Sequence, residues 1–488
     1  MTLEDTRPDT TPAAPTAPAS DAPARSRAVP ATAVVAIAGS FLPLLDSTVV
    51  NVSLDATARQ LGALSDVQWV VTAYLLALAA TMPLVGWLTR RWGVRNVFVG
   101  SVLGFGIGSA VCAFAPTLPV LIGGRVLAGF AGGVLAPVST VVLVRSVPKE
   151  RIAKVQAMSG SVMLIGPLLG PTVGGLLIEA GGWPAIYWIN LPLCAVVAVL
   201  AARNVRGGGG EPGAVLDKLG AVTGPMAAVL LVFGIHLAGV AQGVTPGAAL
   251  AVIGAVLSGA VFVRVELRHR APLTDLRLWS NRIYRLSAMN VFMLGFVLYG
   301  PMVAMPLYLQ VGRGNSAVST GLLMSVGGLG VLGSGVLSSR AIKRFGCGPL
   351  MIVGIVLTLA STGPLLLLRS DTPYWWVLTC LIVRGAGVGL TIVPAMTSAF
   401  ASISSNAVAD ASPQLNLLQR IGGAISATLI TVVVQQALSH PHTQPGNAFG
   451  TPFAWVFVTS LATLVPAVVL ARAEFSGRRQ SAEAAAHA

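Results

Sequence analysis

The sequence predicts an all-α integral membrane protein whose helices form one closely packed bundle. Three observations support this fold class. Hydrophobic residues make up 54% of the 488-residue chain and charged residues only 10%, whereas soluble proteins carry about 25% charged residues. Fourteen apolar stretches have the length of ~20 residues that crosses a bilayer. The 55 glycines let helix backbones approach closely in lipid, which favours a helical bundle and excludes a porin-like barrel.

The fourteen stretches follow one another with short connections, so little of the chain is left for a soluble catalytic domain. The predicted spans cover residues 31–54, 67–88, 97–115, 119–143, 156–178, 184–202, 219–240, 246–263, 286–309, 318–338, 349–368, 375–398, 413–437 and 452–471. Residues 1–29 are rich in alanine, proline and threonine and contain no apolar run. This composition predicts a disordered tail, and residues 473–488 form a second tail.

The positions of the basic residues predict the orientation of the chain. Most of the 31 Lys and Arg residues lie in the tails and in every second connection, whereas the alternate connections contain only Arg59, Arg313 and Arg369. The positive-inside rule then places both termini in the cytoplasm. The net charge of +14 therefore indicates orientation and contact with anionic lipid headgroups, and no nucleic-acid partner is expected. The prevalence of Arg over Lys, with abundant Ala, Gly and Val, indicates a bacterial cytoplasmic membrane protein.

Two parts of the sequence echo each other. The segment 86–93, GWLTRRWG, follows the second span, and the similar segment 335–346 follows the tenth. An arginine followed by closely spaced glycines also occurs twice, at Arg125 and at Arg384. These echoes predict two six-helix halves, a design common among secondary transporters. The predicted units are a half at 30–202, a linker with two added helices at 203–263, a cytoplasmic loop at 264–285 and a half at 286–472.

Five segments together carry a resemblance to a known family. They are LDSTVVNV at 45–52, QWVVTAYLL at 68–76, LIGGRVLAG at 121–129, GPLLGPTVGG at 166–175 and WPAIYWINLP at 183–192. With these segments the chain resembles the major facilitator superfamily, and specifically its fourteen-span drug:proton antiporters. The resemblance implies a major-facilitator-type bundle that exports drugs or antibiotics, with the proton gradient as energy source and no cofactor.

The glycine-proline segment is the motif that marks exporters in the family. Its candidate conformational residues are Gly166, Pro167, Gly170, Pro171, Gly174 and Gly175. Small residues at intervals of four share one helix face and permit close crossing, and prolines bend the helix. We expect a hinge or a tight seal between the halves, with ordinary close packing as the alternative. Two positions depart from the family pattern: Ala128 stands where a glutamine is usual, and Arg90 stands where an aspartate is usual.

Asp46 is the one acidic residue well inside a predicted span. It lies about 12 Å from the outer end of its span and Arg125 about 9 Å from the outer end of the fourth, at ~1.5 Å per residue, so the two share a membrane depth. A buried acid in a membrane bundle is functional by default. We expect Asp46 to carry the proton and Arg125 to be its partner. A static pair, or two groups that separately reach the membrane surface, is the alternative.

Polar and aromatic residues in the spans are candidates for substrate contact. We name Asn51, Trp69, Tyr74, Asn290, Phe296 and Tyr299. Aromatic surfaces with few polar groups suit lipophilic or cationic molecules, although packing or anchoring at the membrane surface is an equal alternative. With one interior carboxylate, the expected substrates are neutral or monocationic.

Several questions stay open at this stage. Arg384 and Arg420 lack an obvious acidic partner and either bond to carbonyls or contact an anionic group, and His236 lies in the added helices. The spacing of Cys, His and acidic residues indicates no metal site. An enzyme or a channel is disfavoured because neither facing catalytic groups nor a filter-like ring is present. The main alternative is an exporter dedicated to one endogenous metabolite, antibiotic or lipid. A monomer is expected.

Overall fold

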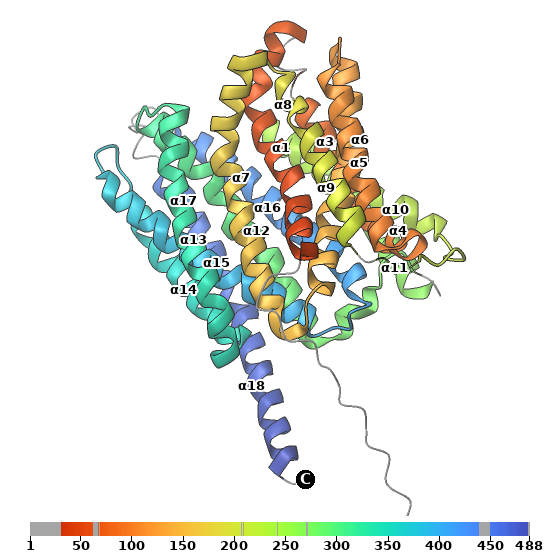
Figure 1. Cartoon of the computed structure of the whole chain (residues 1–488). Coiled ribbons are helices and arrows are strands. Elements are labelled where there is room, and N and C mark those ends of the chain that lie inside the picture. Colours follow the sequence, from red (N-terminus) through yellow and green to blue (C-terminus); the bar gives the residue numbers. More distant parts are fainter. Residues whose placement is uncertain are drawn as a thin grey trace, which may run out of the picture.

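The structure, a computed structural model, describes residues 31–61, 67, 69–205, 207, 209–241, 243–269, 272–438 and 449–486. Within these ranges the side chains of residues 51, 52, 55, 161–169, 171, 172, 317, 318, 336, 438 and 477–486 are not described. The predicted tail at 1–29 therefore lies outside the described residues. The described part is all-helical, as the composition predicts (Figure 1).

The first half is built from helices of membrane-spanning length. They are α1 (Ala31–Leu61), α3 (Trp69–Thr81), α4 (Val85–Trp92), α5 (Val94–Ala113), α6 (Leu118–Arg145), α7 (Ile152–Gly181), α8 (Ala185–Trp188) and α9 (Asn190–Asn204). The helices α3 and α4 form one span, which a 3₁₀ turn at Met82–Leu84 interrupts. Pro83 accounts for the interruption, because proline lacks the N–H that an α-helix needs.

The second half repeats this order. Its helices are α12 (Arg282–Leu307), α13 (Ala317–Phe345), α14 (Cys347–Leu365), α15 (Tyr374–Ala401), α16 (Val408–Leu438), α17 (Gly450–Ala462) and α18 (Leu464–Ala486). The pairs α5–α6 and α3–α6 pack in the first half as α14–α15 and α13–α15 do in the second. α13 is bent by 42°, at the place in the repeat where Pro83 interrupts the first half. The packing thus follows the internal repeat.

Two helices cross between the halves. α7 packs against α1 in its own half and against α13 and α15 in the other, whereas α16 packs against α12 and also against α4 and α6. In Figure 1, α1 begins toward the lower end of the bundle, and α18 projects from that same end. We call this the termini end. A chain that crosses the membrane an even number of times has both of its termini on the same side, as this arrangement requires.

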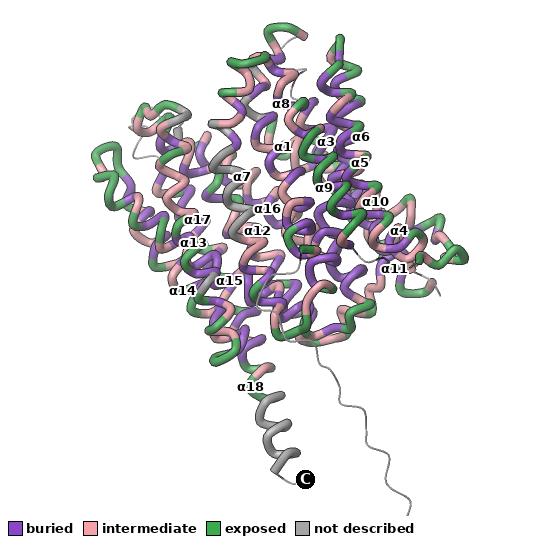
Figure 2. Tube along the Cα trace, viewed as in Figure 1, coloured by how far each residue is buried: buried purple, intermediate pink, exposed green. Residues whose placement is uncertain are grey.

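The two added helices, α10 (Lys218–Val240) and α11 (Pro246–Arg268), form a hairpin outside the halves. α10 packs against α3 and α16, so the hairpin contacts both halves. Many apolar side chains of α11, such as Leu250, Val256 and Leu257, are exposed. Figure 2 shows this exposed surface beside the purple, buried faces of the halves. Exposed apolar side chains on a long helix are matched by lipid.

Among the described residues, twelve helices are long and apolar enough to cross a membrane, and the bent α13 makes up to thirteen. α7, at 30 residues, completes a set consistent with the fourteen predicted spans.

Helix ends differ from the predicted boundaries by several residues. α12 begins at Arg282 instead of 286, because the Asn281 side chain accepts hydrogen bonds from the amides of Ile283 and Tyr284 and caps the helix. α16 begins at Val408 instead of 413, with Pro413 inside it. α11 continues to Arg268, beyond 263, which brings Glu266 into the helix. α18 continues past 471 into the region predicted as a tail.

Candidate functional site

A buried ion pair lies in the first half. Asp46, on α1, is 2% exposed and Arg125, on α6, is 1% exposed. The Nη1 group of Arg125 lies 2.6 Å from Oδ2 of Asp46. The alternative in which each group separately reaches the membrane surface is therefore excluded by this contact. A static pair and an exchangeable pair have the same geometry.

Further contacts hold both members of the pair. Arg125 Nε donates to the Val70 carbonyl at 3.1 Å, and its guanidinium carbon lies 4.0 Å from the centre of the Tyr74 ring. Asn190, at the start of α9, donates from Nδ2 to Asp46 Oδ1 at 2.9 Å. Both carboxylate oxygens of Asp46 therefore accept a hydrogen bond. Such contacts offset the cost of burying two charges.

Glycine on α6 allows α3 to approach the pair. A Cβ atom at Gly129 would lie 2.5 Å from the Tyr74 carbonyl oxygen and 2.8 Å from the Ala77 Cβ atom. A side chain at position 129 would therefore push α3, and with it the Tyr74 ring, away from Arg125. The repeat of an arginine followed by glycines thus has a packing cause in the first half.

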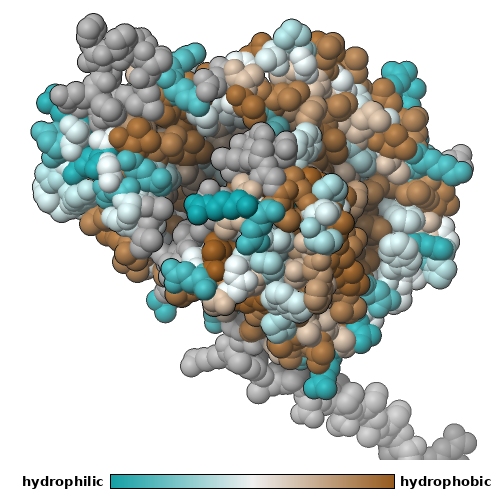
Figure 3. Space-filling model, turned by 90° about the horizontal axis from the view of Figure 1, so that it is seen from above, coloured by the Kyte–Doolittle hydropathy of each residue, from teal (hydrophilic) through white to brown (hydrophobic). Residues whose placement is uncertain are grey.

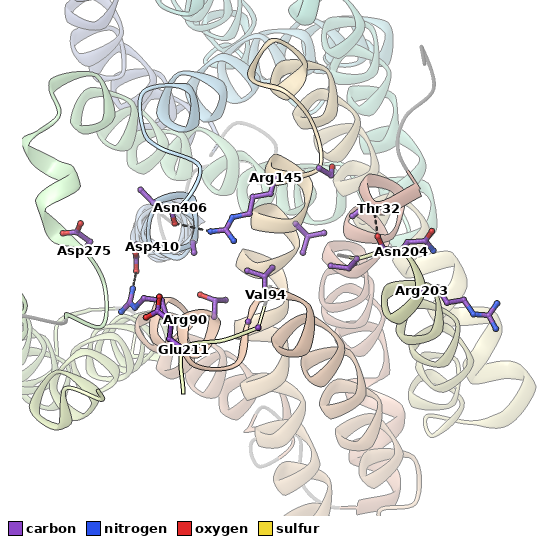
Figure 4. A pocket seen from close by; sticks show the side chains of 18 residues that line it. Thr32, Arg90, Val94, Arg145, Arg203, Asn204, Glu211, Asp275, Asn406 and Asp410 are labelled. Atoms are coloured by element: carbon purple, nitrogen blue, oxygen red, sulfur yellow. Dashed lines mark hydrogen bonds and ion pairs between the residues drawn. The ribbon is translucent and has the colours of Figure 1, made fainter. Parts of the chain in front are cut away.

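A set of polar contacts joins the two halves at the termini end. Arg90 Nη1 lies 2.6 Å from Asp410 Oδ1, and its Nη2 group donates to the carbonyls of Pro272 and Leu273. Arg145 donates to the Asn406 carbonyl (Figure 4). Through Asp410 and Asn406, these contacts link the first half to the second at this end.

The arginine at position 90, which departs from the family pattern, thus has an acidic partner in the other half. Asp410 lies in the first turn of α16, where a carboxylate is also favoured by the helix dipole. A cavity of about 1080 Å³ lies beside this contact and has a mostly polar lining, in which both residues take part (Figure 4). The segment after the second span therefore does take part in an ion pair, but it contributes the arginine, Arg90, instead of the aspartate that the family pattern implies.

A second cavity, of about 430 Å³, lies in the second half among α12, α13 and α15. α12 and α13 are scarcely in contact, whereas α15 packs against both. The lining is mostly apolar and includes Met302, Met305 and Met324, with Arg384 of α15 as its charged member. Figure 3 looks down on the end opposite the termini and shows apolar surface around a hollow between the left-hand part of the molecule, where the second half lies, and the rest.

The aromatic candidates of the first half do not line this cavity. Tyr74 is fully buried against Arg125, so it belongs to the ion pair. Trp69, the first residue of α3, is 44% exposed. The Asn51 side chain lies outside the described residues.

The three candidates of α12 are not brought together either. Asn290 is buried and donates to the Leu286 carbonyl, beside a small cavity inside the second half. Phe296 is half-buried and stacks edge-to-face with Phe292 at 5.5 Å. Tyr299 is 38% exposed and packs on Gly423 of α16. The 430 Å³ cavity is instead lined by the neighbouring face of α12, which carries Met302 and Met305.

The glycine-proline motif lies in the middle of α7. A Cβ atom at Gly170 would lie 2.6 Å from the Thr48 Cβ atom, so this glycine permits a close crossing of α7 with α1. Gly174 is buried, and Gly175 has open space where a side chain would be. The side chains at Pro167 and Pro171 and the surroundings of Gly166 lie outside the described residues.

Some functional candidates are visible only in the structure. Asn190 bonds to Asp46, yet in the sequence it stands out only as part of a segment typical of the family. Glu266 and Asp217 are both buried in the added hairpin, and a Cβ atom at Gly220 would touch a carboxylate oxygen of each. Their separation in sequence gives no signal that both lie beside Gly220.

Comparison with known proteins identifies relatives of the chain. Residues 36–427 match the model of the Major Facilitator Superfamily. The chain is 32% identical to the Multidrug resistance protein B homolog of Mycobacterium tuberculosis (strain ATCC 25618 / H37Rv), over 84% of this chain and 77% of that protein. It is 29% identical to the Methylenomycin A resistance protein of Bacillus subtilis (strain 168), over 82% of this chain and 86% of that protein.

A solved structure has a similar fold. The human organic anion transporter MFSD10 superimposes with a TM-score of 0.64 at 17% sequence identity, over 89% of this chain and 99% of that chain. At this level of identity the likeness concerns the fold alone.

Proposed function

We propose that this chain, which belongs to the major facilitator superfamily, exports lipophilic drugs or antibiotics in exchange for protons. Membership of the family makes the chain a multi-pass membrane transporter and not an enzyme. Relatives named for multidrug and antibiotic resistance support drug efflux. The observation that carries the proton-coupled part is the buried pair of Asp46 and Arg125, in contact at 2.6 Å.

The pair has two alternative states with different charge. When Asp46 is deprotonated, Arg125 neutralises its charge in a buried position. When a proton binds to Oδ2 of Asp46, the attraction is lost and Arg125 needs another acceptor, because an arginine does not release its proton. Proton binding therefore weakens the contact between α1 and α6. We assign Asp46 as the proton carrier and Arg125 as its partner, energised by the proton gradient alone.

The termini end supplies the gate in this proposal. We assign this end to the cytoplasmic face of a bacterial inner membrane, as the positive-inside rule predicts from the distribution of basic residues. The contact of Arg90 with Asp410 and the contact of Arg145 with Asn406 then close the transporter toward the cytoplasm. Opening toward the cytoplasm requires both to separate, while α7 moves against α13. The Gly170 crossing and the neighbouring prolines of α7 would serve as the hinge or seal of this movement.

The apolar lining of the cavity in the second half suits the body of a lipophilic substrate. The single interior carboxylate, Asp46, would have to bind a monocationic substrate. This is less favourable because Asp46 is already neutralised by Arg125. The internal repeat encloses a path within one chain, so we propose that a monomer suffices. No partner other than substrate, protons and membrane lipids is required.

The test is proton movement in acidified inverted membrane vesicles, followed by a pH-sensitive dye while lipophilic compounds are added. We expect compounds that are exported to release protons in the wild type and not in Asp46→Asn. Asp371→Asn, which changes an exposed acid in a connection, is the matched control and should behave like the wild type. Proton release that is unchanged in Asp46→Asn would overturn the assignment of Asp46. A response to a single compound of a broad panel would indicate a dedicated exporter.

A further inference from the structure

The two halves carry arginines at corresponding places, but their surroundings differ. Arg125 has a carboxylate, an aromatic ring and a carbonyl around it. Arg384, its counterpart on α15, is 6% exposed. Its described partners are the Thr362 hydroxyl, at 3.0 Å from Nη1, and the Val297 carbonyl, which accepts from Nη2. Both partners are neutral.

The charge of Arg384 is therefore not balanced within the described part of the chain. A charged group inside a membrane costs at least ~2.5 kcal/mol unless it is paired. A guanidinium carries five N–H donors, of which the described residues accept two. The buried acids of the described chain lie elsewhere: Asp46 contacts Arg125, Asp410 contacts Arg90, and Asp217 and Glu266 lie in the added hairpin.

Arg384 also lines a cavity large enough for a ligand. The cavity has a volume of about 430 Å³, within the range of ~300–1,000 Å³ usual for small-molecule sites. Its remaining lining is mostly apolar, with Met302, Met305, Met324 and Leu381 among the members. Methionine side chains adapt to ligands of different shape. An apolar pocket with one cation at its wall matches a molecule with an apolar body and one negative group.

We propose that this cavity binds a lipophilic anion whose charged group bonds to Arg384 and whose body lies against the methionines. The proposal rests on the proposed export function and specifies its substrate class. A carboxylate is the favoured group, because its two oxygens match two parallel N–H groups of a guanidinium. In this arrangement one half binds the proton at Asp46 and the other binds the substrate at Arg384.

The test uses three probes with the same aromatic body: 4-(pyren-1-yl)butanoate, its methyl ester and 4-(pyren-1-yl)butyltrimethylammonium. Binding to the full chain in zwitterionic nanodiscs is followed by quenching of tryptophan fluorescence. A charge-assisted hydrogen bond predicts that the wild type binds the carboxylate at least ~10-fold more tightly than the ester. The cation should bind more weakly than the ester.

Variants separate a ligand contact from a structural role. Arg384→Gln should abolish the preference for the carboxylate and leave binding of the ester unchanged, while Arg384→Lys should keep part of the preference. Arg344→Gln, at an exposed arginine, is the matched control. Met324→Phe, which narrows the cavity without adding a tryptophan, should weaken both probes. Equal binding of carboxylate and ester to the wild type would overturn the proposal, as would an equal loss of both probes in Arg384→Gln.

Two further comparisons identify the source of the anion and separate this proposal from the export function. If phosphatidylglycerol in the nanodisc competes with the carboxylate, the anion site holds a lipid headgroup; if it does not, the site holds a dissolved substrate. If the ester is exported through Asp46 and the carboxylate is not preferred, the anion site is refuted and proton-coupled export is supported. If the carboxylate binds at Arg384 but no probe responds to a pH gradient, proton-coupled export is refuted and the anion site is supported.

Discussion

Removing one member of the Asp46–Arg125 pair should destabilise the protein more than removing both. In Asp46→Leu, Arg125 keeps its charge at 1% exposure and cannot lose its proton. We expect a loss of about 3–5 kcal/mol in the free energy of unfolding, the usual effect of an unpaired buried charge. In Arg125→Met the loss should be smaller, because Asp46 can take up a proton and still accept from Asn190.

The double variant Asp46→Leu/Arg125→Met removes both charges together. Replacing a buried pair by apolar residues of similar volume is often neutral, so it should be more stable than Asp46→Leu by about 2 kcal/mol or more. The vacated donor of Asn190 still faces Ser109 Oγ at 3.2 Å, which limits the residual cost.

The measurement is reversible unfolding in mixed micelles by titration with dodecyl sulfate, monitored by tryptophan fluorescence for all four proteins. The coupling energy is the loss of unfolding free energy in the double variant minus the sum of the losses in the two single variants. If the losses add within about 0.5 kcal/mol, as for independent sites, the two charges do not stabilise each other and the reasoning is refuted.

Two more predictions concern the gate and the helix crossing. Asp410→Asn removes a charge-assisted bond to Arg90, so labelling of a cysteine placed at Ala407, beside the termini-end cavity, should increase ~10-fold. The exchange Arg90→Asp/Asp410→Arg should restore the low labelling of the wild type. If it does not, the ion pair is excluded as the cause. Gly129→Ala should cost ~1–3 kcal/mol of unfolding free energy, since overpacking strains the crossing, whereas Gly100→Ala, where a side chain meets nothing within 4 Å, should not destabilise; equal effects would contradict the close approach at Tyr74.

Much of the fold follows from patterns that lipid imposes on a sequence. Apolar length identifies the spans, and the repeated arginine-glycine segments correspond to helices with the same neighbours in each half. The helix ends are less predictable, because they depend on local contacts such as the Asn281 side chain at the start of α12.

The site is only partly visible in the sequence, for a physical reason. Asp46 and Arg125 stand out because charge is rare and costly inside a membrane. Aromatic residues carry no such signal, since the same side chains serve packing, anchoring or binding. Tyr74 therefore lies on Arg125 rather than in a cavity, and the cavity of α12 is lined by methionines that the sequence does not single out. Contacts such as that of Asn190 with Asp46 depend on tertiary packing alone.

The most direct test of proton coupling separates driven transport from binding in one set of proteoliposomes. Wild-type protein and Asp46→Asn are compared in uptake of a labelled substrate driven by a pH gradient, and in exchange of labelled for unlabelled substrate without a gradient. If Asp46 carries the proton, the variant should lose the driven uptake and retain the exchange. Driven uptake at the wild-type rate in the variant would contradict the account, because the proton would then pass through another group.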